Sequence, residues 1–269
     1  MEFRNIVDLH THSIISFDGN DSCESLCSTA VQKGAKVLAI TDHCDIDGAD
    51  LDVMKLCTQQ YEATKAVKEK YKNELEVLQG LEIGQGIYRV ELTNQVLQTF
   101  DYDFILGSLH NLDKMEDFCF LNYYDYDVYE LLQKYFEDIF KLSNMDIFDS
   151  LAHLTYPLRY IVAREKMNVD MSKFQNIIDA IFENLVKNKK ALEINTSGLF
   201  MDMKDTLPNI SLIKRYKEIG GEYITIGSDS HFAARVCQGI EQGMQIAYDA
   251  GFRNVTVFRK RNPILVPFV

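Results

Sequence analysis

The feature that most limits how this chain can fold is an alternation of short apolar runs and helix-like segments along its whole length. Segments such as residues 51–71 carry Lys and Glu at helical spacing and separate one apolar run from the next. This alternation predicts a parallel sheet, and no Pro- or Gly-rich linker divides residues 1–269, which indicates one domain. We therefore predict an α/β fold in which seven βα units close into a barrel. The predicted strands cover residues 6–12, 37–41, 75–78, 104–106, 147–151, 191–194 and 223–226.

Residues that begin or end helices set the expected helix boundaries. Asp21 or Ser22 is expected to cap a helix that ends before Gly34, because a short polar side chain accepts a free amide at a helix start. Pro208 is expected in the first turn of a later helix that ends at Gly220. The remaining expectations are helices over 51–71, 89–98 and 172–188, helices ending near 142 and 250, and a strand over 255–259 before Pro263.

The chain contains six histidines, and each follows an apolar run that is typical of a strand. His10 and His12 would point to the same face of a strand, because side chains alternate along it. Such a pair alone is as typical of two hydrogen-bonded histidines at a strand edge as of a metal site. The other four, however, also stand at strand ends, which favours metal ligands. They are His43, His110, His153 and His231.

Carboxylates accompany these histidines. Asp42 precedes His43, Asp229 lies two residues before His231, and Glu82 closes another apolar run. Imidazole and carboxylate ligands suit Zn, Mn or Fe, whereas a thiolate site would need clustered cysteines. Since the active site of a parallel barrel lies at the carboxyl-terminal ends of its strands, we predict a multinuclear metal site there.

Composition excludes several other classes of protein. A net charge of −12 argues against a surface for nucleic acid or for an anionic membrane, since both require basic patches. We find no apolar run long enough to cross a bilayer. The six cysteines show no disulfide framework and no basic, apolar leader is evident, so we expect a cytoplasmic protein.

Six motifs, in order along nearly the whole chain, resemble the polymerase and histidinol phosphatase (PHP) family. They are D-x-H-x-H at 8–12, T-D-H at 41–43, Glu82, G-S-x-H at 107–110, His153 and G-S-D-S-H at 227–231. The run 193–199 and the chain length are most similar to the stand-alone histidinol-phosphate phosphatases of that family. The resemblance implies a distorted (β/α)7 TIM-like barrel, three divalent metal ions and phosphoester hydrolysis.

The resemblance also implies which residues hold the three ions. A shared water would lose its proton between two ions bridged by Glu82 and attack phosphorus, while the third ion would neutralise phosphate charge. Asp18 lies in the loop after the first strand and is the best carboxylate there. The implied ligand sets are His10, His12, Glu82 and Asp229 for the first ion, Glu82, His110 and His153 for the second, and Asp18, His43 and His231 for the third.

Other site residues are expected in the loops around the cluster. We assign catalytic roles to Asp42, Asp229 and His231, and we expect Asp8 and Asp42 to orient ligand histidines. The loops after the fifth and sixth strands are expected to bind the substrate. Arg159 would hold two phosphate oxygens through its planar fork, with Arg164 as the alternative. The expected substrate-binding residues are Arg159, Asn195 and Ser197.

The predicted function is hydrolysis of L-histidinol phosphate to L-histidinol and phosphate. Its substrate is a small phosphorylated amino alcohol, and the acidic, aromatic segment 113–130 would either cover this cationic ligand or pack on the barrel helices. The alternatives are a protein-tyrosine or nucleotide phosphatase on the same fold, or a non-catalytic metal-binding regulatory module.

Overall fold

The computed structural model describes residues 3–47 and 52–269, and its centre is a barrel of parallel strands. Backbone bonds between 9–12 and 226–230 join the first strand to the last, including one from His12 N to Ser230 O of 2.8 Å. The ring of seven strands is therefore nearly closed, which confirms the predicted fold class. The barrel strands, in spatial order, are β1 (Val7–Asp8), β2 (Val37–Ile40), β4 (Glu76–Gly84), β5 (Phe104–Ser108), β6 (Ser150–Leu151), β7 (Ala191–Asn195) and β8 (Ile224–Gly227).

Strand β3 (His43–Asp45) continues β2 after a break at residues 41–42, because both strands pair with β4 in parallel. Cys44 in the middle of β3 is buried against Cys57, while its two neighbours are less buried. This alternation turns His43 toward the barrel opening and Cys44 away from it, because successive side chains of a strand point to opposite faces.

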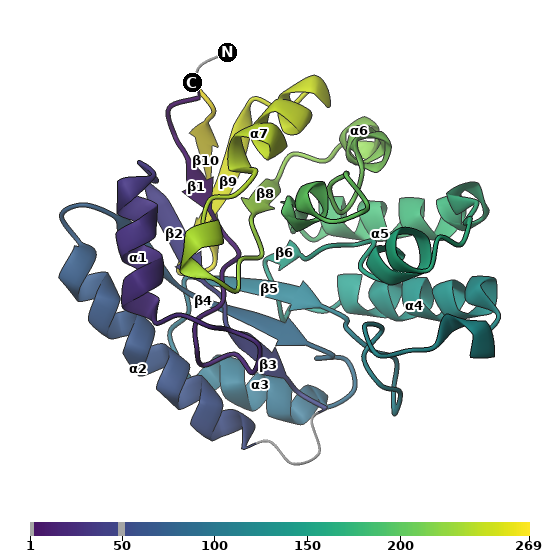
Figure 1. Cartoon of the computed structure of the whole chain (residues 1–269), viewed down its shortest axis with the longest axis horizontal. Helices are drawn as coiled ribbons and strands as arrows, with labels where there is room; N and C mark the ends of the chain where they lie inside the picture. Colours follow the sequence, from purple (N-terminus) through teal and green to yellow (C-terminus); the bar gives the residue numbers. More distant parts are fainter. Residues whose placement is uncertain (1–2, 48–51) are drawn as a thin grey trace.

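Helices surround the barrel (Figure 1). Ser22 caps α1 by accepting a bond from Ser25 N, and Gly34 follows that helix with φ +75°, as predicted. The predicted start of the second helix at residue 51 lies outside the described residues. Within the described ranges, no helix has both the length and the apolar character needed to cross a membrane. The helices are α1 (Cys23–Gln32), α2 (Val53–Tyr71), α3 (Val90–Thr99), α4 (Val128–Ser143), α5 (Gln175–Lys187), α6 (Ile210–Ile219) and α7 (Ile240–Asp249).

One local prediction is wrong, and one strand was not predicted. Pro208 does not lie in the first turn of α6, because Asn209 accepts a bond from Leu212 N and caps a helix that begins at Ile210. The chain also does not end its last strand before Pro263. Strand β9 (Asn254–Arg259) is as expected, but it pairs with a second, antiparallel strand β10 (Asn262–Pro267). Proline is tolerated there because an edge strand leaves one side of its backbone unpaired.

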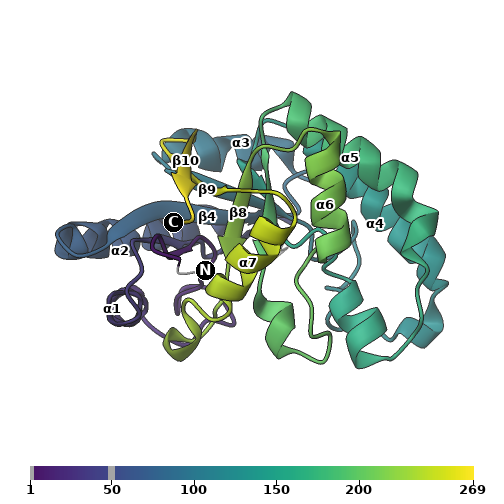
Figure 2. The same ribbon diagram turned by 90° about the horizontal axis from the view of Figure 1, so that it is seen from above.

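The β9–β10 hairpin covers the amino-terminal end of the barrel, beside β4 and β8 (Figure 2). Phe258 of β9 stacks on Phe104 at the start of β5, with ring centroids 5.5 Å apart. Arg261 in the hairpin turn binds both oxygens of Asp149, the residue before β6, at 2.7 and 2.8 Å. Because this end is closed by the hairpin, the opposite end is left for the loops that carry the histidines.

Replacing Arg261 by Met is expected to lower the free energy of unfolding by about 2 kcal/mol, measured by urea denaturation. Asp149 is only 3% exposed, and without Arg261 its carboxylate would keep a single hydrogen bond among the described residues, the one from Ile105 N. The matched control is Arg253→Met, since Arg253 donates only to the backbone oxygens of Tyr248 and Phe252. Equal losses in both variants would contradict the proposed stabilising role of the Arg261–Asp149 pair.

Candidate metal centre

All six histidines lie in one cluster at the carboxyl-terminal ends of the barrel strands. Five of the rings follow one another around this opening. The successive ring centroids are 5.0 Å apart for His10–His12, 4.2 Å for His12–His43, 5.2 Å for His43–His110, 5.2 Å for His110–His153 and 5.7 Å for His153–His10. His231 stacks on His12 with centroids 4.1 Å apart. The cluster exists because parallel strands bring residues that are distant in sequence to the same edge.

Glu82 on β4 occupies the middle of the cluster and is fully buried. Its Oε1 lies 2.9 Å from His153 Nε2 and 3.3 Å from His110 Nε2. Its Oε2 lies 2.9 Å from His43 Nδ1 and 3.4 Å from His10 Nε2. The two oxygens thus face different groups of histidines, as a carboxylate that bridges two ions would.

Two further carboxylates complete the cluster. Asp229 Oδ1 lies 3.5 Å from His12 Nε2 and 3.6 Å from His10 Nε2. Asp18 Oδ2 lies 3.1 Å from His231 Nε2, and its Oδ1 lies 3.6 Å from His43 Nε2. The loop after β1 therefore turns Asp18 inward, and all nine residues predicted as metal ligands lie together.

Several polar atoms of this cluster are buried without a hydrogen-bond partner among the described residues. Buried polar groups in native proteins are nearly always paired, and leaving one unpaired is costly. These atoms converge, since several sets of three lie within 4.8 Å of one another. The residues fit divalent metal ions, which would satisfy these atoms. These atoms are His10 Nε2, His12 Nε2, His43 Nδ1, His153 Nδ1, His231 Nε2 and Glu82 Oε2. His43 Nδ1 and Glu82 Oε2 lie 2.9 Å apart, but not in hydrogen-bonding geometry.

The charges of the cluster are strongly coupled. Burial alone would raise the pKa of Glu82, but the positive charges of His10, His110 and His43 hold it well below its usual range. Burial alone would lower the pKa of His10, but Glu193, Glu82 and Asp229 raise it well above its usual value. Because metal ligands must be deprotonated, we expect metal binding to displace protons from these histidines.

Asp42 lies behind the cluster. Its carboxylate accepts bonds from Ser13 N at 2.6 Å, Ser13 Oγ at 2.8 Å and Ser16 Oγ at 2.8 Å. Ser16 Oγ in turn lies 3.2 Å from His12 Nδ1 and accepts a bond from His43 N. Asp42 therefore orients ligand histidines through Ser16, as predicted. The catalytic role predicted for Asp42 is not supported, because its oxygens are occupied by the 13–16 loop.

Asp8 accepts a long bond of 3.5 Å from the backbone nitrogen of His10, but it contacts no histidine ring among the described residues. Its carboxylate accepts bonds from Ser228 N at 2.8 Å, Ser228 Oγ at 2.6 Å and Cys237 N at 2.7 Å. These bonds fix the loop after β8, which carries Asp229 and His231. Asp8 therefore contributes to the site mainly through that loop, and also through the backbone of His10.

Sequence reasoning missed the two carboxylates that contact ligand rings directly. Glu193 Oε1 lies 2.7 Å from His10 Nδ1, and Asp45 Oδ1 lies 3.3 Å from His110 Nδ1. A signal was present, since Asp45 lies two residues beyond His43 and Glu193 sits within an apolar strand, as Glu82 does. Buried carboxylates that hydrogen-bond ligand histidines are common around metal centres.

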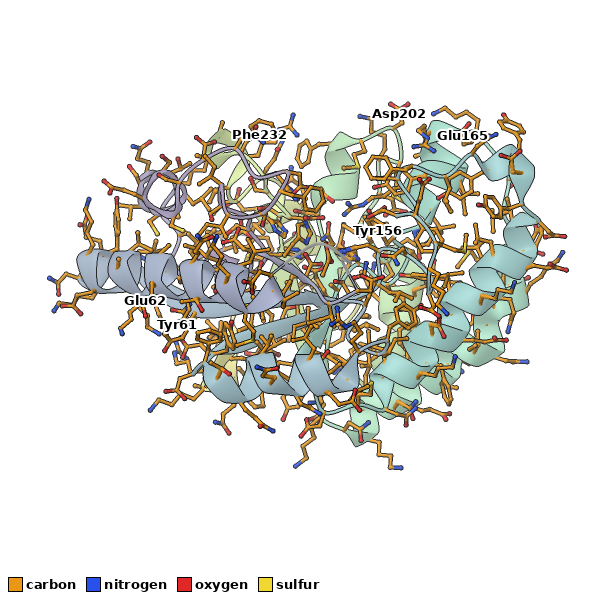
Figure 3. The ribbon with its side chains drawn as sticks, turned by 90° about the horizontal axis from the view of Figure 1, so that it is seen from below. Tyr61, Glu62, Tyr156, Glu165, Asp202 and Phe232 are labelled. Carbon is orange, nitrogen blue, oxygen red and sulfur yellow. The ribbon has the colours of Figure 1, made fainter. Side chains whose placement is uncertain are left out.

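A cavity of about 250 Å³ opens beside the cluster. Tyr156, which points into the central region of the molecule in Figure 3, lies at this cavity with its ring 5.1 Å from both His110 and His153. Asp117 accepts a bond from Tyr156 Oη at 3.0 Å. The cavity is lined by Phe17, Asp18, His43, His110, Asp117, Cys119, Phe120, His153, Tyr156, Arg159, Tyr160, Asp229 and His231.

The three residues predicted to bind substrate lie together, but only Arg159 lines this cavity, since Ser197 lines a neighbouring cavity and Asn195 is fully buried. Arg159 Nη2 donates to Asp229 Oδ2 at 2.5 Å, to Ser197 Oγ at 2.7 Å and to Asn195 Oδ1 at 3.3 Å. Arg164, the alternative, does not line the cavity, and it donates instead to the backbone oxygens of Cys119 and Leu121. Of the two arginines that the sequence left as alternatives, Arg159 lines the cavity and Arg164 does not.

The aromatic residues of segment 113–130, which was expected either to cover the ligand or to pack on the barrel helices, lie in two different environments. Phe118 and Tyr123 are each 1% exposed and pack in the core. Phe120 is 71% exposed and lines the cavity. Part of the segment therefore packs in the core and part lines the cavity, and its covering of a ligand stays a prediction.

The fold and the cluster define a parallel-barrel protein with a histidine–carboxylate centre suited to metal ions. Residues 8–197 match the model of the PHP domain family, and the chain belongs to this family. It is 31% identical over 257 residues to a probable histidinol-phosphatase of Thermotoga maritima, covering 95% of this chain and 97% of the relative. It is 26% identical over 254 residues to a histidinol-phosphatase of Lactococcus lactis, covering 94% of each.

A solved structure supports the fold. The crystal structure of histidinol phosphate phosphatase from Lactococcus lactis, complexed with zinc, L-histidinol and phosphate, superposes with a TM-score of 0.83 at 22% identity. The match covers 97% of this chain and 99% of that one.

Proposed function

We propose that this protein is a metal-dependent phosphomonoesterase that hydrolyses L-histidinol phosphate to L-histidinol and phosphate. The observation that carries the proposal is the set of unpartnered imidazole and carboxylate atoms around Glu82, directly beside a cavity that contains Arg159. The full-length similarity to histidinol-phosphatases supports the choice of substrate.

The centre would hold three divalent ions, chosen among Zn, Mn and Fe, and the zinc of the Lactococcus structure favours the first. When bound, the ions would supply a hydroxide at neutral pH and neutralise charge on the phosphate. The proposed ligand sets are His10, His12, Glu82 and Asp229, then Glu82, His110 and His153, then Asp18, His43 and His231.

The residues at and beside the cavity have distinct proposed roles. Arg159, Asn195 and Ser197 would bind phosphate oxygens, since Arg159 Nε is buried without a partner among the described residues. Asp229 and His231 keep their proposed catalytic roles, because both line the cavity and lie within the cluster.

The leaving group would occupy the aromatic side of the cavity. L-Histidinol carries an ammonium group and an imidazole. The carboxylate of Asp117 and the rings of Tyr156 and Phe120 present negative charge and aromatic faces, which suit such a cation.

The test is release of phosphate from a panel of substrates by the zinc-loaded protein. We expect kcat/KM for L-histidinol phosphate to exceed the values for phosphotyrosine and nucleoside monophosphates by about tenfold or more, because neither competitor combines an ammonium group with an imidazole in a leaving group that has no carboxylate. Higher kcat/KM for phosphotyrosyl peptides would instead assign the protein as a tyrosine phosphatase. Bound zinc with no phosphate release from any substrate would indicate a regulatory module.

A further inference from the structure

Glu193 on β7 lies behind the cluster, is 1% exposed and does not line the cavity. Its two oxygens nevertheless bind three donors from three different segments. Oε1 lies 2.7 Å from His10 Nδ1. Oε2 accepts bonds from His153 N at 2.8 Å and from Asn195 Nδ2 at 3.2 Å. Glu193 thus contacts two histidines that we assign to different metal ions.

The bond to His10 determines which ring nitrogen is free. When Nδ1 carries the hydrogen and donates it to Glu193, Nε2 is left with its lone pair. That nitrogen faces Glu82 Oε2 at 3.4 Å and Asp229 Oδ1 at 3.6 Å, and it has no hydrogen-bond partner among the described residues. Glu193 therefore selects the tautomer of His10 that a metal ion requires.

The bond to His153 acts on its backbone. His153 has φ +23°, on the left-handed side that residues with a Cβ rarely adopt. The bond from His153 N to Glu193 holds this conformation, and with it the ring, whose Nε2 lies 2.9 Å from Glu82 Oε1. The same carboxylate therefore fixes the direction of a second ligand.

Neighbouring residues leave space for this arrangement. A Cβ at Gly227 would lie 2.7 Å from Glu193 Oε1 and 2.3 Å from His10 Cβ. Both distances are too short for real atoms, so the contact between Glu193 and His10 requires glycine at position 227. The contact between Glu193 and His10 therefore depends on Gly227 of β8 as well as on Glu193 of β7.

We propose that Glu193 is a positioning residue that sets the ligands of two metal ions at once, through the ring of His10 and the backbone of His153. The proposal rests on the metal assignment above. It requires a carboxylate, because all three partners donate and both oxygens must accept. An amide at the same place has one acceptor and one donor, so it would oppose either His10 Nδ1–H or His153 N–H.

The test compares Glu193→Gln with the unchanged protein. The apoproteins are titrated with Zn²⁺ alone against a chromophoric chelator, and bound zinc is counted. We expect two of the zinc positions to weaken by about 10–100-fold in Glu193→Gln. The control is Asp149→Asn, which alters a buried carboxylate at the other end of the barrel and should bind zinc as the unchanged protein does.

The outcomes separate this proposal from the proposed function. If the unchanged protein binds no zinc, the metal assignment fails and the role of Glu193 falls with it. If the unchanged protein binds zinc and Glu193→Gln binds it equally well, only the role of Glu193 is overturned. If zinc binding weakens at only one of the two positions, the proposal that Glu193 sets the ligands of both ions is overturned.

A second measurement covers the case in which Glu193→Gln does not fold. Long-range proton–nitrogen spectra of the unchanged, zinc-loaded protein report the tautomer of each histidine. We expect the hydrogen of His10 on Nδ1. A hydrogen on Nε2 of His10 would overturn the proposal without any variant.

Discussion

Glu82→Gln is expected to lose zinc from two positions together and to lower kcat/KM for L-histidinol phosphate by at least about 10²–10³-fold. Oε1 of Glu82 lies 2.9 Å from His153, a proposed ligand of the second ion, and Oε2 lies 3.4 Å from His10, a proposed ligand of the first. An amide has one acceptor oxygen and one donor nitrogen, so it fails as a ligand on one side and loses the negative charge on both. Zinc content and phosphate release measure the two effects.

The matched control for this variant is Glu76→Gln, which makes the same chemical change at the other end of the same strand. Glu76 pairs with Arg259 of the hairpin and is distant from the cluster, so zinc content and kcat/KM should stay as in the unchanged protein. Protein from which a chelator has removed the metal gives the baseline kcat/KM for comparison. A full zinc complement in Glu82→Gln would rule out the bridging role.

Arg159→Met is expected to lower kcat/KM by about one to two orders of magnitude, with zinc content retained. A charge-assisted hydrogen bond contributes about 1.5–3 kcal/mol, and methionine keeps the apolar stem while removing the guanidinium. Arg159 is held by Asn195, Ser197 and Asp229, which leaves Nε free of partners among the described residues. Steady-state kinetics with L-histidinol phosphate measure the loss.

Arg235→Met tests whether any lost positive charge near the cluster has the same effect. Arg235 lines a neighbouring cavity that also contains Asp18, Arg159, Asp229 and His231. If a direct contact from Arg159 to phosphate is responsible, Arg235→Met should change kcat/KM by less than about threefold, the scale of a screened surface charge. Equal losses in the two variants would assign the effect to the electrostatic field of the site, and unchanged kcat/KM in Arg159→Met would rule out the contact.

Local sequence determined where the histidines would stand. An apolar run that ends in a histidine forms a strand whose end carries that histidine, and parallel strands deliver their ends to one edge. Side-chain alternation predicted that His10 and His12 face one point, and their rings do lie together, although β1 ends at Asp8 and the Thr11–Ser230 bridge continues its pairing. The cap at Ser22 needed only a hydroxyl at a helix start. These features depend on neighbours in sequence, so they were predictable.

The partners of each side chain were decided by the tertiary structure. Asp8, Asp42 and Glu193 are all buried carboxylates near strand ends, and nothing in the sequence distinguishes their roles. Glu193 meets His10 because the closed barrel brings β7 and β8 against the chain after β1, whereas Asp8 meets Ser228 and Asp42 meets Ser13. Contacts of this kind depend on strand register and barrel closure, which involve residues far apart in the chain.

The geometry of the loops likewise could not be predicted from the sequence. Asp18 reaches His231 because the loop after β1 is tied to the loop after β8, with Asn20 N donating to His231 O at 3.0 Å. Arg159 enters the cavity while Arg164, five residues later, holds the backbone at Cys119 and Leu121. The sequence by itself determined which residue types arrive at the barrel opening. The closed barrel decided which of them face the metal centre and which support it from behind, because each contact joins segments that only folding brings together.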